Sequence, residues 1–225
     1  IGTAKESDFP TPAEYTYWKS RNDRTFYIDY EIGDDYELIE LCKAIIQLNI
    51  AEKDIDVSEL KPIRIFIHSF GGELEQANFL CDLIQSSRIP IITIAMGVAM
   101  SAGFLILLSG HKRYAFKHSQ LMVHSGGGSF QGTAEQLESA QKNYKKQIEA
   151  MKSYILERTS IDEKTFNKNR TKDWYLNEEE LIKELKDLGP LRAIIVKDLH
   201  KKKELKDSFL FKYNQAPLIF TIEEI

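Results

Sequence analysis

The stretch that decides the fold runs from Ile89 to Gly110 and reads IPIITIAMGVAMSAGFLILLSG. Its first eight residues are apolar without alternation, which is typical of a strand buried on both faces. The small residues from Gly97 to Ala99 are expected to break this strand, and the apolar run after Ser101 has helical length. Ser101 is therefore expected in a turn between a strand and a helix.

Strand and helix patterns alternate on both sides of this stretch. Strands are predicted from β-branched and aromatic residues, and helices from apolar residues spaced three and four apart. The order predicts an α/β fold. The expected strands are residues 24–32, 63–69, 89–96 and 113–124 (split near Lys117), and the expected helices are 35–48, 73–86 and the segment after Ser101.

A long helix is expected to begin after Thr133, because Thr133 to Gln136 has the form of a capping box. Its apolar stripe is long and its opposite face is rich in lysine, so it either packs on the body or projects toward another subunit. A second cap at Asn177 predicts a helix that ends near Gly189. The strand-like pieces RAIIV and PLIFTI then suggest a packed C-terminal appendage.

The composition is that of a globular protein, with 225 residues, 43% hydrophobic and 28% charged. This length suits one domain, alone or with an appendage. The net charge of -4 gives no support to nucleic-acid binding, and no uninterrupted apolar run is long enough for a membrane span. Cys42 and Cys81 are expected to be buried free thiols, which favours a reducing, cytoplasmic compartment.

Ser101 raises a question of chemistry, because a serine hydroxyl needs a base and oxyanion donors to act as a nucleophile. The helix expected after it offers free N–H groups at its first turn. A second small-residue turn, Gly71-Gly72, follows the strand at 63–69. Two such turns side by side would direct two N–H groups at one oxygen. A turn serine is more often structural, so the turn alone does not decide its role.

Four segments together resemble the proteolytic subunit of the Clp protease, ClpP. They are HSFGGELEQANFLCDLIQ, GVAMSAG, QLMVHSGGGSFQGT and KDWYLNEEEL, in that order along the chain. Ser101 precedes His124 by 23 residues, and His124 precedes Asp173 by 49. These spacings are close to those of the family. The resemblance covers roughly residues 24–189.

The resemblance implies a ClpP/crotonase-like fold of strand-strand-helix units with a projecting handle helix. It implies Ser101 as nucleophile, His124 as general base and Asp173 as the carboxylate that orients the imidazole. The backbone N–H groups of Gly72 and Ala102 are implied as the oxyanion hole. An extended substrate would lie along Gly71 and a glycine-rich strand made of Gly126, Gly127, Gly128, Ser129 and Phe130.

The family also implies an assembly. The chain is expected to form homo-oligomeric rings of seven subunits, stacked in pairs, that receive unfolded polypeptides from an ATP-dependent Clp-type unfoldase. No cofactor or metal is expected in the peptidase itself. The implied organisation is an axial gating segment at residues 1–23, the peptidase domain at 24–189 and a C-terminal extension at 190–225.

Several departures from the family pattern predict a divergent member. Phe70 replaces the proline of the family's Ser-Pro-Gly-Gly turn, so the turn loses a fixed backbone angle. Ser125-Gly126 replaces a Gln-Pro pair, and the run of three glycines costs more to order.

Two alternatives from other classes remain open. A catalytically silent ring subunit would have no need to keep Ser101, His124 and Asp173 together. A crotonase-type acyl-CoA enzyme shares the broad fold and the oxyanion hole but has no need for this set. Signal-peptide peptidases of similar fold use a Ser/Lys pair, which a histidine at position 124 disfavours.

Overall fold

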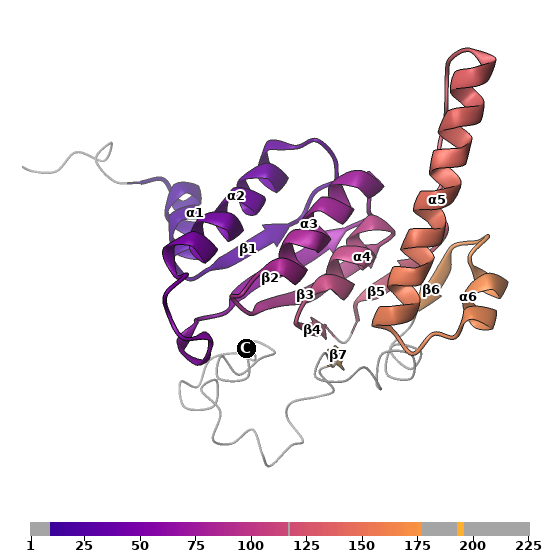
Figure 1. Cartoon of the computed structure of the whole chain (residues 1–225). Coiled ribbons are helices and arrows are strands. Elements are labelled where there is room, and N and C mark those ends of the chain that lie inside the picture. The colour runs from indigo at the N-terminus through magenta and orange to yellow at the C-terminus, as the bar shows by residue number, and fades with distance from the viewer. Residues whose placement is uncertain (1–9, 117, 177–192, 196–225) are drawn as a thin grey trace, which may run out of the picture.

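The computed structural model describes residues 10–116, 118–176 and 193–195 (Figure 1). A seven-stranded sheet forms its centre, in the order β1-β2-β3-β4-β7, with β5 paired to β3 and β6 paired to β5. Every pairing is parallel except that of β5 with β6. The strands are β1 (Thr25–Ile28), β2 (Ile63–Ser69), β3 (Ile91–Met100), β4 (Lys112–Ala115), β5 (Gln120–Val123), β6 (Trp174–Leu176) and β7 (Ala193–Ile195).

The helices α2, α3 and α4 lie side by side along the sheet, and α1 lies beside β1 (Figure 1). The apolar stripes predicted for α2 and α3 do face the core, where residues such as Leu38, Ile45, Leu80 and Ile84 are fully buried. The helices are α1 (Pro12–Asn22), α2 (Tyr36–Ala51), α3 (Leu74–Ser86), α4 (Ala102–Ser109), α5 (Ala134–Arg158) and α6 (Glu163–Asn169), and η2 (Val57–Glu59) is a single 3₁₀ turn.

The α/β class is confirmed, with strands and helices alternating from β1 to β4 as the sequence pattern predicts. The predicted handle is α5, which begins at the expected capping box of Thr133 and Gln136 and projects away from the sheet (Figure 1). Its buried residues, Met151 and Ile155, lie in its C-terminal half. The N-terminal half of α5 therefore extends beyond the core.

The expected strand break at Gly97 is wrong, because β3 continues to Met100. Pairing on both sides holds this part of the strand, with Ala99 opposite Ser69 of β2 and Val98 opposite Gln120 of β5. Gly97 has a φ of +99°, and the register of β2 against β3 shifts nearby, between Ile67 and Ser69. The glycine thus produces an irregularity within a continuous strand.

The region predicted as a strand split near Lys117 forms β4 and β5, which both pair with β3 in succession. Ile92 to Ala95 pair with β4, and Val98 to Met100 pair with β5. This arrangement brings the C-terminal end of β5 beside the end of β3. It is the feature of the fold that positions the site described below.

Three other expectations concern the ends of the chain. The expected strand at 24–32 is shorter, and Ile32 instead forms an isolated parallel bridge with Gly72. In the proposed C-terminal extension, β7 pairs with β4, which agrees with the strand-like character of RAIIV. The helix expected after Asn177 and the piece PLIFTI lie outside the described residues, as does most of the extension at 190–225.

Candidate active site

Ser101 occupies the turn between β3 and α4, as predicted. It has a φ of 52° and a ψ of -119°, a conformation that a residue with a side chain adopts only when its surroundings hold it there. Its N–H donates to the carbonyl of Met122 at 2.9 Å, and its carbonyl accepts from Phe104 N–H at 3.0 Å. Bonds to β5 on one side and to α4 on the other thus hold the turn.

The second small-residue turn lies directly beside Ser101. Gly71 has a φ of +112° and Gly72 a φ of +146°, and a Cβ on Gly71 would lie 3.2 Å from the backbone nitrogen of Ala102. The Ser69 hydroxyl donates to the Tyr30 carbonyl at 2.7 Å and accepts the Gly71 N–H at 3.2 Å. Ser69 therefore holds this turn in place, a role that the sequence interpretation did not assign to it.

Gly72 and Ala102, whose N–H groups the resemblance implies as the oxyanion hole, follow Gly71 and Ser101 in the two adjoining turns. In the bridge between the loops, Ile32 N–H donates to Gly71 O and Glu73 N–H donates to Ile32 O, so the Gly72 N–H takes no part in it. Ala102 is the first residue of α4, where N–H groups have no partner within the helix. Two N–H donors directed at one oxygen are suited to binding a negatively charged oxygen, and the assignment of these two as an oxyanion hole stays a prediction.

His124 lies at the end of β5, and its Nε2 is 2.7 Å from Ser101 Oγ. The pairing of Met100 with Met122 sets this distance, because it places the residues after β3 and β5 side by side. The imidazole is partly buried, with 28% of the side chain exposed. The imidazole therefore contacts the hydroxyl while part of the ring remains exposed to solvent.

Asp173 directly precedes β6, and its Oδ1 lies 3.2 Å from His124 Nδ1. The antiparallel pairing of Val123 with Trp174 places the two residues next to each other. A carboxylate only accepts hydrogen bonds, so Nδ1 carries the proton and Nε2 is free to accept the proton of the Ser101 hydroxyl. The three residues predicted from the sequence are therefore in contact in the order that activates a serine.

Residues 124–132 form a loop, which is one of the two forms that the residues SGGGSFQGT allow, the other being the irregular edge strand that the resemblance favours. Gly126 has a φ of +75°, and the ring of Phe130 lies edge-on to Tyr144 of α5 at 5.5 Å. Together with α5, the loop borders a groove of about 1000 Å³ that begins next to His124. The prediction that Gly126 to Phe130 bind substrate stays a prediction.

The other histidines that the structure describes have structural contacts or lie on the surface. His68 Nδ1 lies 2.6 Å from the carbonyl of Met96, and His111 Nδ1 accepts the N–H of Ile91 at 3.0 Å. Burial lowers the pKa of His111. His118 is exposed in the turn between β4 and β5.

Within the described ranges, no three acidic, histidine or cysteine side chains are grouped to hold a metal ion. None of the helices in those ranges is both long and apolar enough to cross a membrane. Cys42 and Cys81 are buried and free, as expected.

Comparison with known proteins identifies the family of the chain. The chain is 32% identical over 142 residues to ATP-dependent Clp protease proteolytic subunit 2 of Treponema denticola, covering 62% of this chain and 70% of that protein. It is 28% identical over 123 residues to the ATP-dependent Clp protease proteolytic subunit of Deinococcus radiodurans, covering 54% of this chain and 60% of that protein. The family model for Clp protease matches residues 20–186. The chain therefore belongs to the Clp protease family.

Proposed function

We propose that the chain is a serine endopeptidase subunit that cleaves unfolded polypeptides. The observation that carries the proposal is the continuous contact from Ser101 Oγ to His124 Nε2 at 2.7 Å and from His124 Nδ1 to Asp173 Oδ1 at 3.2 Å. Membership of the Clp protease family supports the same activity. In this proposal Ser101 is the nucleophile, His124 the general base and Asp173 the carboxylate that orients the imidazole.

The first half of the reaction forms an acyl-enzyme. His124 Nε2 takes the hydroxyl proton as Ser101 Oγ bonds to the carbonyl carbon of the scissile peptide. The carbonyl oxygen becomes an oxyanion, which accepts hydrogen bonds from the N–H groups of Gly72 and Ala102. His124 then gives the proton to the amide nitrogen, the C–N bond breaks, and the amine product leaves.

The second half releases the acyl group by hydrolysis. His124 takes a proton from a water molecule, whose oxygen attacks the ester carbon of the acyl-enzyme. The same two N–H groups stabilise the second oxyanion. When it collapses, the bond to Ser101 Oγ breaks, the proton returns to the serine, and the carboxylic acid product leaves. Asp173 remains ionised throughout and stabilises the positively charged imidazole.

The substrate is proposed to bind in an extended form beside Gly71 and along Gly126 to Phe130. The small side chains there leave the main chain open, so hydrogen bonds to a peptide backbone give affinity with little sequence selectivity. Three glycines make this segment costly to order, which is why we place its conversion to a strand in the substrate-bound state. The groove between this loop and α5 is the room available for substrate side chains.

We further propose that the chain works inside homo-oligomeric rings fed by an ATP-dependent unfoldase. The projecting helix α5 supports this, because its N-terminal half extends beyond the core and is free to contact another ring. The two named relatives are subunits of ATP-dependent proteases. Residues 24–189 would form the peptidase domain, with an axial segment before it and an extension after it.

The test is labelling with a fluorophosphonate probe, read by the intact mass of the full chain. The expected result is one adduct on the wild type, no adduct on Ser101→Ala, and an unchanged adduct on Ser58→Ala, which removes an exposed serine from η2. An adduct that persists in Ser101→Ala would contradict the assignment. Absence of any adduct on the assembled wild type would favour a catalytically silent subunit.

A further inference from the structure

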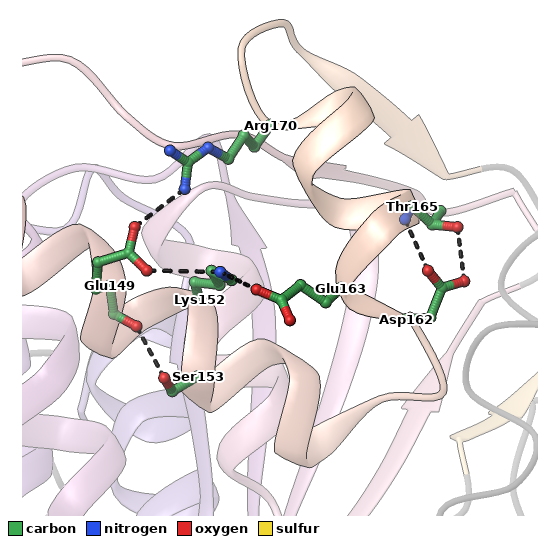
Figure 2. A network of polar contacts seen from close by, with 7 residues as sticks. All are labelled: Glu149, Lys152, Ser153, Asp162, Glu163, Thr165 and Arg170. Carbon is green, nitrogen blue, oxygen red and sulfur yellow. Dashed lines mark hydrogen bonds and ion pairs between the residues drawn. The ribbon is translucent and has the colours of Figure 1, made fainter.

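Four side chains of alternating charge connect the handle helix to the segment that carries Asp173 (Figure 2). Arg170 Nη1 lies 3.2 Å from Glu149 Oε1, and Lys152 Nζ lies 3.5 Å from Glu149 Oε2. Lys152 Nζ also lies 2.6 Å from Glu163 Oε1. Because Glu163 begins α6 and Arg170 caps its end, the network fastens both ends of α6 to α5.

The backbone of Arg170 lies next to the candidate catalytic residues. Its carbonyl accepts the N–H of Ser125, the residue after His124, at 2.9 Å. Its own N–H donates to the carbonyl of Phe166 at 2.8 Å, and Phe166 is fully buried. Arg170 also precedes Asp173 by three residues. One residue thus contacts the loop that contains His124 and Ser125 and begins the segment that carries Asp173.

Asp173 depends on such a neighbour because packing does little to hold it. Its side chain is 56% exposed, and the pairing of β6 with β5 begins only at the next residue, Trp174. On its N-terminal side, Lys172 N–H bonds to the carbonyl of Asn169 within the same short turn. Arg170 connects this turn to the rest of the molecule by its backbone hydrogen bond with Ser125 and its ion pair with Glu149.

The charges are arranged so that the Arg170 side chain has a defined position. Each oxygen of the Glu149 carboxylate faces a different cation, Arg170 on one side and Lys152 on the other. Lys152 is largely covered, with 13% of its side chain exposed, and its hydrogen bond to Glu163 raises its pKa. Because Glu149 and Glu163 are more than half exposed, each of these ion pairs contributes little free energy to global stability.

We propose that Arg170 is a positioning residue for the reaction, and that its ion pair with Glu149 transmits the position of the handle helix to His124 and Asp173. The inference rests on the proposed serine peptidase function. In this arrangement the ion pair keeps the Arg170 carbonyl against Ser125 and thereby keeps Asp173 within hydrogen-bond distance of His124. Arg170 itself makes no contact with the reacting atoms.

The experiment compares Arg170→Gln and Glu149→Gln with Glu163→Gln, a matched control. The control removes one carboxylate from the same network but leaves the pair of Glu149 and Arg170 intact. Three quantities are measured on the full-length assembled protein. They are kcat and KM for a short fluorogenic peptide, the rate constant for fluorophosphonate labelling, and hydrogen exchange of the peptide that contains Ser125.

We expect Arg170→Gln and Glu149→Gln each to lower kcat and the labelling rate by about two- to fivefold, because a largely exposed ion pair cannot bias the local geometry by more than its own small free energy. Because Glu149 and Arg170 also line the groove proposed for substrate side chains, the labelling rate of the small fluorophosphonate probe, and not KM, tests the positioning role; exchange at Ser125 should become faster. The double variant should be no worse than either single variant, because both remove one interaction. Arg170→Lys, which keeps the charge, should recover most of the loss.

Several results would overturn the proposal. An equal loss in Glu163→Gln would show a general effect of the helix pair, and a higher KM at an unchanged labelling rate would make Arg170 a substrate contact. A loss of kcat that merely follows a loss of assembly, measured by sedimentation, would also overturn it. If the wild type is not labelled at Ser101, the proposed function fails, and Ser125 exchange alone then decides whether the positioning contact exists.

Discussion

Gly71 lies so close to Ser101 that a Cβ built on it would come within 2.7 Å of Ser101 Cβ and 2.9 Å of the Met100 carbonyl oxygen. Real Cβ atoms do not approach other atoms this closely, so the two turns fit together only because residue 71 has no side chain. Its φ of +112° adds a second requirement for glycine. The contact explains why a glycine turn and the serine turn occur together in this chain.

Gly71→Ala is therefore expected to displace Ser101 from the Gly72 and Ala102 N–H groups. We expect kcat for a short peptide to fall by about 100-fold and the free energy of unfolding to fall by about 1–3 kcal/mol. Gly33→Ala is the matched control, because a Cβ there meets only Asp35 Oδ2 at an ordinary 3.5 Å. A kcat equal to that of the wild type in the Gly71→Ala variant would contradict this expectation, because it would show that the turns of Gly71 and Ser101 can move apart without loss of activity.

Ser69→Ala should weaken the Gly71-Gly72 turn, which Ser69 holds by its hydroxyl group. Ser69 is buried, and its hydroxyl links the Tyr30 carbonyl to the Gly71 N–H. Its removal leaves both groups without this partner, which costs about 1–3 kcal/mol of unfolding free energy. Denaturation in urea measures the loss, with Ser86→Ala, an exposed serine at the end of α3, as control. Equal midpoints for the two variants would contradict this role.

Asp173→Asn tests the carboxylate of the proposed triad. The amide can donate to His124 Nδ1 and so favours the wrong tautomer, leaving Nε2 unable to take the Ser101 proton. We expect kcat to fall roughly 10³- to 10⁴-fold, with KM nearly unchanged. Combining Asp173→Asn with His124→Ala should cost little more than His124→Ala alone, because the residues act as a unit. Multiplicative losses would mean that the two side chains act independently.

The two buried thiols predict a loss of stability at alkaline pH. Burial raises the pKa of Cys42 to about 11 and that of Cys81 to about 12, from an ordinary value of 9.0. Above pH 9 the unfolded chain loses its thiol protons while the folded chain keeps them, so the free energy of unfolding falls as the pH rises toward 11–12. The contribution is fully present below pH 9.

Urea denaturation between pH 8 and pH 10.5 measures this effect. The variant with both Cys42→Ala and Cys81→Ala should be less stable at pH 8, because small side chains leave cavities in the core. Its stability should depend less steeply on pH than that of the wild type, because it lacks the two thiols. Parallel curves for the two proteins would show that other groups cause the alkaline loss.

Local sequence patterns predicted most of the elements that surround the site. β2, α3 and the capped start of α5 follow directly from their apolar periods and their caps, which depend on neighbours a few residues away. The helices α1 and α6 were not among the predictions, although each begins with a capping side chain, Thr11 and Asp162 respectively. α6 has seven residues, a length at which tertiary contacts outweigh periodicity.

The prediction of a strand break at Gly97 was wrong because here too tertiary contacts outweigh the local pattern. A glycine followed by small residues indicates the end of a strand when only the sequence is considered. Pairing with β2 on one side and β5 on the other nevertheless keeps residues 98–100 in the sheet. The ion pair of Arg170 with Glu149 also could not be predicted from the sequence, because 21 residues separate the two side chains and no local pattern connects them.

The sequence by itself determined the order of most of the strands and helices, the small-residue turns and the chemical types of the site residues, because each depends on local preferences of the chain. Only the tertiary structure decided that Ser101, His124 and Asp173 touch. Their contact depends on the register of Met100 against Met122 and of Val123 against Trp174. A shift of one residue in either pairing would turn the side chains to the other face of the sheet and separate them.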